Sequence, residues 1–135
     1  MNQRVKKLWV EALRSGEYQQ GTGALKRYRE LDFKADGTYG PVDPKDCTFC
    51  CLGVLTDLYI RETEGAAWEN GEFFYPAFRG EEAILHPDVA EWAGIDTNPR
   101  LDLGEGSPSS RGGIAALNDG GETFTTIADL IEEQL

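Results

Sequence analysis

The chain has 135 residues, 40% hydrophobic and 27% charged, which suits one domain with a single core spanning residues 1–135. The net charge is −11, and all of it arises in residues 68–135, which hold fourteen acidic residues, three arginines and no lysine. Such a surface repels phosphate backbones, so we expect no binding to duplex nucleic acid through a basic patch.

The sequence also indicates where the protein works. No apolar run approaches the roughly 18 residues that cross a membrane. The N-terminal segment, residues 1–18, is basic but lacks the apolar stretch and cleavage site of a secretory signal. Three cysteines, an odd number, favour reduced thiols over a disulfide framework. We therefore expect a cytoplasmic protein that does not associate with membranes.

The first half of the chain opens with a clear helix. Residues 4–15 place apolar side chains at steps of three and four, and Gly16 follows where a helix commonly ends. A strand is expected near residues 24–28. The segment 33–46, with Asp36-Gly37 and two prolines, indicates a hairpin or a surface loop.

The middle of the chain predicts two more helices and a hairpin between them. Residues 49–62 show a helical apolar period. Asn70-Gly71 separates two short aromatic-rich runs, which is the pattern of a two-residue type I′ turn. A short helix is expected over residues 87–93, because a proline suits its first turn and Gly94 suits its end.

The last third is less regular before its final helix. Residues 98–103 are a possible strand, residues 104–113 have the composition of a loop, and residues 114–119 are apolar without a decisive period. The C-terminal segment predicts an amphipathic helix capped by Thr123 or Thr125. The predicted fold class is therefore α+β, a small antiparallel sheet with N-terminal, central and C-terminal amphipathic helices.

The three cysteines lie together and invite a chemical interpretation. Cys47 and Cys50 have zinc-knuckle spacing, but the further ligands on offer are Cys51, which adjoins Cys50, and the single histidine, His86. A nucleophilic thiol would need a base, and His86 has no recognisable partner motif. We therefore expect Cys50 and Cys51 to pack as small apolar residues, and we expect no metal site and no cofactor.

The arginines of the acidic half are the more promising candidates for a ligand site. Arg79, Arg100 and Arg111 are its only cations. Arg111 lies in a loop of serines and glycines, residues 107–113, whose backbone N–H groups are suited to binding an anion. Each arginine either pairs with a neighbouring carboxylate or faces an anionic ligand.

Aromatic side chains near the predicted hairpin supply a second element of such a site. Alternation along a strand sends Phe73 to one face and Phe74 to the other. One face belongs to the core, and the other is either further core or a surface on which a nucleobase stacks. An amide such as that of Asn118 can bind the edge of a base.

The motifs LWVEALRSGEYQQGTGALK, FCCLGVLTDLY, HPDVAEWAGI and IAALNDGGETFTTIADLIEE follow one another through almost the whole chain. In this order they resemble a group of small proteins encoded mainly in bacteriophage genomes, identified as Thoeris anti-defence sponges. The resemblance implies a homo-oligomeric protein that binds cyclic ADP-ribose-type or cyclic oligonucleotide immune signals without cleaving them. The chain departs from similar sequences by an insertion, residues 29–46.

The expected function is therefore sequestration of a small anionic nucleotide in the infected bacterial host, with no catalytic residue. The residues that we expect to bind the ligand are Phe73, Phe74, Arg79, Arg100, Arg111 and Asn118. Two alternatives remain open at this point. One is an enzyme that acts on a small nucleotide through carboxylates, and the other is an acidic inhibitor of a host protein, of the DNA-mimic type.

Overall fold

The structure is a computed structural model, and it describes residues 1–28, 31–33, 39–41, 47–68, 77–78, 84–101 and 113–135. Five helices and three pairs of short strands occur in these ranges. In chain order the elements are α1 (Gln3–Arg14), β1 (Lys26–Tyr28), β2 (Leu31–Phe33), β3 (Tyr39–Pro41), β4 (Cys47–Phe49), α2 (Cys51–Glu62), β5 (Ala67–Trp68), β6 (Ala77–Phe78), α3 (Pro87–Ala93), α4 (Gly113–Asp119) and α5 (Phe124–Gln134).

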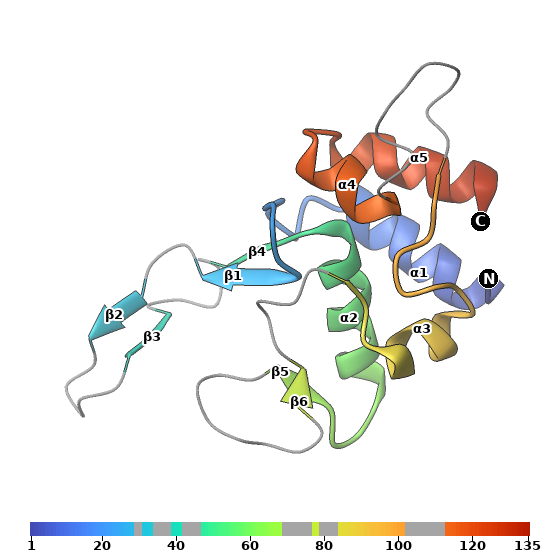
Figure 1. Cartoon of the computed structure of the whole chain (residues 1–135). Coiled ribbons are helices and arrows are strands. Elements are labelled where there is room, and N and C mark those ends of the chain that lie inside the picture. The colour runs from blue at the N-terminus through green and yellow to red at the C-terminus, as the bar shows by residue number, and fades with distance from the viewer. Residues whose placement is uncertain (29–30, 34–38, 42–46, 69–76, 79–83, 102–112) are drawn as a thin grey trace.

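The helices form the body of the molecule around α2. Helix α1 packs against α5 and α2, while α2 also contacts α3 and α4. The core between them includes the fully buried side chains of Trp9, Leu52, Leu55, Ile127 and Ile131. The indole N–H of Trp9 donates to the carbonyl of Cys51 at 2.9 Å, so the largest core residue of α1 also fixes the start of α2. Figure 1 shows both chain ends on one side of this body.

Each of the first two helices begins at a residue whose side chain accepts a hydrogen bond from one of the free N–H groups of the first turn. Asn2 accepts from the backbone N–H of Val5 at 3.1 Å at the start of α1. Helix α2 begins at Cys50, whose sulfur accepts from the N–H of Gly53 at 3.4 Å. A cysteine is an unusual cap, and this one is also buried among the core residues.

The strands form three separate two-stranded ladders in the described part of the chain. Strands β1 and β4 pair antiparallel, as do β2 and β3, whereas β5 and β6 pair parallel. The β2–β3 ladder lies in the expected insertion and projects away from the helical body (Figure 1). The chain is therefore a mixed α and β structure in which the helices dominate.

The predicted helices at the N-terminus, the centre and the C-terminus are confirmed, and so is the short helix over 87–93. A single small antiparallel sheet is not confirmed, since the strands of the described ranges form three separate pairs, two antiparallel and one parallel. No strand occupies residues 98–101, and the undecided segment 114–119 belongs to α4. The turn expected at Asn70-Gly71 lies outside the described residues.

No helix in the described ranges is long and apolar enough to cross a membrane.

The cap of α5 permits a simple test of this local structure. Thr123 accepts from the N–H of Thr126 at 3.2 Å, whereas Thr125 is exposed within the helix. We expect Thr123→Ala to lower the free energy of unfolding by about 1 kcal/mol, because the cap hydrogen bond is lost. Thr125→Ala is the matched control and should leave it nearly unchanged. Equal losses of unfolding free energy for the two variants in urea denaturation would contradict the assignment of Thr123 as the cap.

Candidate ligand cavity

A cavity in the described part of the molecule has a volume of about 670 Å³ and opens to solvent. It lies where the end of α3, the start of α1 and the end of α5 meet, on the side of the chain ends in Figure 1. Its lining combines apolar and polar residues: Met1, Ala90, Glu91, Gly94, Ile95, Asp96, Asn98, Pro99, Arg100 and Leu135. A volume of this size falls within the range of small-molecule sites, roughly 300–1,000 Å³.

One wall of the cavity is the C-terminal end of α3, which is held firmly. Gly94 adopts a left-handed conformation, with φ of 73°, and its N–H donates to the carbonyl of Ala90 at 2.8 Å. The N–H of Asn2 donates to the carbonyl of Ala93 at 2.9 Å, which joins this wall to the start of α1. A side chain at position 94 would be strained by its φ and would press on Asn2. The wall therefore depends on glycine.

The segment that carries Arg100 forms another part of the lining, and α4 anchors its backbone. The carbonyl of Pro99 accepts from the N–H of Ile114 at 2.8 Å, and Asn98 Oδ1 accepts from the N–H of Ala115 at 3.0 Å. Pro99 and Leu101 are both buried on either side of Arg100. The arginine thus stands on a fixed backbone while its own side chain is exposed.

Three charged side chains line the cavity: the guanidinium of Arg100 and the carboxylates of Glu91 and Asp96. All three residues are exposed. Among the described residues, none of these side chains forms a hydrogen bond or a salt bridge, although opposite charges share one cavity. The arrangement can therefore bind an anionic group at Arg100 and accept hydrogen bonds at the two carboxylates.

The structure brings one of the predicted ligand residues, Arg100, to this cavity. Phe73, Phe74, Arg79 and Arg111 lie outside the described residues. The apolar lining next to Arg100 comes from residues that the sequence alone did not single out, namely Ala90, Ile95, Pro99 and Leu135.

Asn118 has a different place, at the centre of a buried hydrogen-bond network. Its side chain is completely buried, and its Oδ1 accepts from the N–H of Cys51 at 3.1 Å and from Gln20 Nε2 at 3.0 Å. Its Nδ2 donates to the carbonyl of Gly21 at 2.7 Å. Asn118 therefore joins α4 to the start of α2 and to the segment after α1, and it is not presented at the surface of the described structure.

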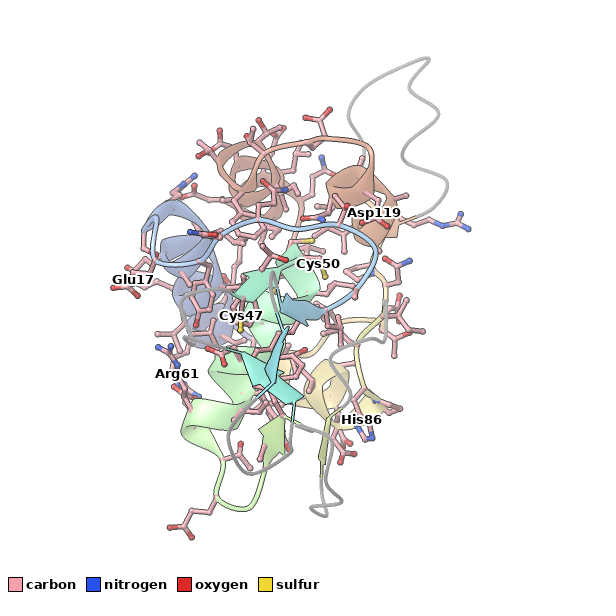
Figure 2. All side chains as sticks on the ribbon, turned by 90° about the vertical axis from the view of Figure 1, so that its left-hand side faces the viewer. Glu17, Cys47, Cys50, Arg61, His86 and Asp119 are labelled. Atoms are coloured by element: carbon pink, nitrogen blue, oxygen red, sulfur yellow. The ribbon has the colours of Figure 1, made fainter. Side chains whose placement is uncertain are left out.

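The cysteines also lie in the interior, as the sequence predicted for Cys50 and Cys51. All three cysteines are buried, and none of them forms a disulfide in the described structure. Burial raises the pKa of Cys50 to about 11 and raises that of Cys51 well above its ordinary value. In Figure 2, His86 lies well apart from Cys47 and Cys50. Across the described ranges, no three metal-binding side chains come together.

The raised thiol pKa values predict slow chemistry at the cysteines. At pH 7.5 we expect no reaction with a thiol reagent in the folded protein and three equivalents after denaturation, since the thiolate is the reactive form. Cys50 and Cys51 hold their protons more tightly in the folded protein than in the unfolded chain, so the free energy of unfolding should fall as the pH rises from about 8.5 towards 11. Rapid labelling of the native protein at pH 7.5 would contradict the buried placement.

A second polar cluster surrounds Asp57 on α2, whose side chain is 14% exposed. Its carboxylate accepts from the hydroxyl of Tyr18 at 2.6 Å and from the indole N–H of Trp68 at 3.0 Å, and it pairs with Arg61 at 3.1 Å. Burial, followed by the hydrogen bond to Asp57, raises the pKa of Tyr18 well above its usual range. Asp57 therefore fixes Trp68, and with it β5.

Lys26 completes this aromatic corner of the molecule. Its ammonium lies 5.2 Å from the ring centroid of Trp68 and 5.6 Å from that of Phe49. The rings of Phe49 and Tyr18 meet edge to face at 5.1 Å. The polar and aromatic side chains of this cluster contact one another, and these contacts attach β1 and β5 to α2.

The chain belongs to a family described as a domain of unknown function, DUF8296. The family model matches residues 1–40 and 34–135, which together span the sequence. The two matched segments overlap within the expected insertion at 29–46. No curated protein and no solved structure matches the chain.

Proposed function

We propose that this protein binds a small anionic nucleotide and sequesters it without cleaving it. The cavity beside Arg100 is the observation that carries the proposal. It combines a volume suited to a nucleotide, apolar surface from Ala90, Ile95 and Pro99, and a guanidinium without an ion partner among the described residues. Arginine is well suited to phosphate because its planar donors bind two oxygens at once.

The state of the cysteines supports binding over covalent catalysis. A nucleophilic cysteine needs a lowered pKa and access to substrate. The thiols in this chain are buried, and the pKa values of Cys50 and Cys51 are raised. His86 Nδ1 accepts from the N–H of Asp88 at 3.1 Å at the start of α3, so this nitrogen serves as a helix cap.

The biological setting is proposed from the sequence resemblance. Phage-encoded sponges remove cyclic ADP-ribose-type or cyclic oligonucleotide signals in the cytoplasm of an infected host, and they assemble into oligomers. This chain is proposed to do the same as a homo-oligomer. A subunit interface near the cavity would add cations from a second copy, which an acidic protein with few arginines needs for an anionic ligand.

A thermal-shift series tests the proposal and its site together. The wild-type protein is heated with cyclic ADP-ribose isomers and with cyclic di- and trinucleotides. A ligand present at a hundred times its Kd should raise the Tm by about 10 °C. Arg100→Gln should weaken that ligand about 10- to 100-fold, because a charge-assisted hydrogen bond to phosphate is lost.

The matched control is Arg4→Gln, which changes an exposed arginine that lies outside the cavity and pairs with Glu62. It should bind the ligand as the wild type does. Absence of any shift across the series would refute the proposed function. A shift that survives in Arg100→Gln would leave a binding protein whose site lies elsewhere.

A further inference from the structure

We infer that the cavity recognises the ribose of its ligand through Glu91 and Asp96, next to a phosphate bound by Arg100. This inference rests on the proposed function and specifies its ligand class: a nucleotide with free ribose hydroxyls and few phosphate charges. The observation behind it is the mixed charge of the lining. Carboxylates would repel the oxygens of a phosphate, yet two of them line the cavity that contains the arginine.

The chemistry of the three side chains separates two parts of a ligand. A guanidinium only donates hydrogen bonds, so it binds phosphate oxygens. An ionised carboxylate only accepts them, so it requires hydroxyl or amino hydrogens on the ligand. Carboxylates on ribose hydroxyls recur in proteins that bind dinucleotides. A ribose phosphate carries both kinds of group a few bonds apart.

The positions of the two carboxylates suit this role. Glu91 lies on α3, and Asp96 lies two residues beyond Gly94, which ends that helix. In the described structure, neither carboxylate is used in a hydrogen bond or a salt bridge. Removing them therefore breaks no hydrogen bond or salt bridge among the described residues.

The charge of the lining limits the ligand further. Two carboxylates and one guanidinium give these side chains a net charge of −1. Each further phosphate charge on a ligand meets this negative field. The cavity should therefore prefer a nucleotide with few charges, and ATP should bind more weakly than AMP. A purely basic phosphate site would give the opposite order.

The test compares AMP with 2′-deoxy-AMP, which differ by one hydroxyl, in ¹H–¹⁵N NMR titrations of the full chain. We expect AMP to bind the wild type about tenfold more tightly and to shift resonances of residues 90–100. In the Glu91→Ala/Asp96→Ala double variant, the ratio of the two Kd values should fall close to one. Arg100→Gln should weaken both ligands and keep the ratio.

Glu11→Ala is the matched control, since Glu11 is an exposed carboxylate on α1 outside the cavity, and it should keep the tenfold ratio. A wild-type ratio near one, or a ratio unchanged in the double variant, would overturn the ribose inference. In those cases, and if AMP does not bind at all, the ribose inference fails, whereas a thermal shift with a cyclic nucleotide leaves the proposed function intact. No binding of AMP and no shift with any cyclic nucleotide ends both.

Discussion

Gly53→Ala will unfold most of the protein or destabilise it severely, because no space exists for a methyl group at this position. A Cβ on Gly53 would clash with the carbonyl oxygen of Leu25 and would lie 2.6 Å from the carbonyl carbon. The obstacle is backbone, which cannot rotate away as a side chain can. The same carbonyl accepts from the N–H of Cys50 at 3.2 Å, so moving it also breaks the bond that holds α2 beside β1.

We expect a loss of about 3 kcal/mol or more, at the upper end of the range for overpacked cores. Urea denaturation followed by circular dichroism measures it. Gly65→Ala is the control: Gly65 has φ of 86° and nothing within 4 Å of an added Cβ, so this variant carries backbone strain without a clash. It should cost about 1 kcal/mol. Equal losses for the two variants would show that α2 does not approach Leu25 this closely.

Asn118→Ala should cause the second large loss of stability. This variant also distinguishes a structural role of Asn118 from a role in ligand binding. Truncation leaves the N–H of Cys51 and the carbonyl of Gly21 without their buried partners. Each unsatisfied buried group costs about 1–3 kcal/mol, so we expect a total loss of about 3 kcal/mol. Asn2→Ala, which removes the exposed cap of α1, should cost only about 1 kcal/mol.

A double-mutant cycle with Gln20→Ala should reveal coupling, since Gln20 donates to both Asn118 Oδ1 and the carbonyl of Glu122 and belongs to the same network. The folded fraction of Asn118→Ala should still respond to a nucleotide that shifts the wild type. Unchanged stability together with a lost thermal shift would return Asn118 to the ligand site and contradict its structural placement.

Of the five helices in the described ranges, all but α4 were predictable from the sequence, because they present an apolar period or clear end signals. Pro87 and Gly94 bracket α3 at the expected positions, and the expectation that α5 begins at Thr123 or Thr125 is met by Thr123. The pairing of the strands was harder to predict from the sequence. Segments of two or three residues have too few positions to show alternation, and the parallel pairing of β5 with β6 joins residues ten positions apart.

The candidate site was only partly predictable, for a physical reason. Arg100 was predicted as a ligand residue because it is one of few cations in the acidic half of the chain, and it lines the cavity. Glu91 and Asp96 could not be distinguished from the other acids of the chain, because nothing in the sequence indicates that the end of α3 lines the same cavity as Arg100. Asn118 resembled a ligand amide, yet its burial follows from contacts with residues almost a hundred positions away.

Recovery of the bound molecule tests the central proposal most directly. The protein is incubated with each candidate cyclic nucleotide and freed of excess ligand, and the complex is then denatured by heat. Mass spectrometry of the released material identifies what was bound. The proposal predicts intact ligand in a fixed ratio to protein, and no conversion of excess ligand over time. Cleaved ligand, or turnover at substoichiometric protein, would contradict sequestration and make this protein an enzyme.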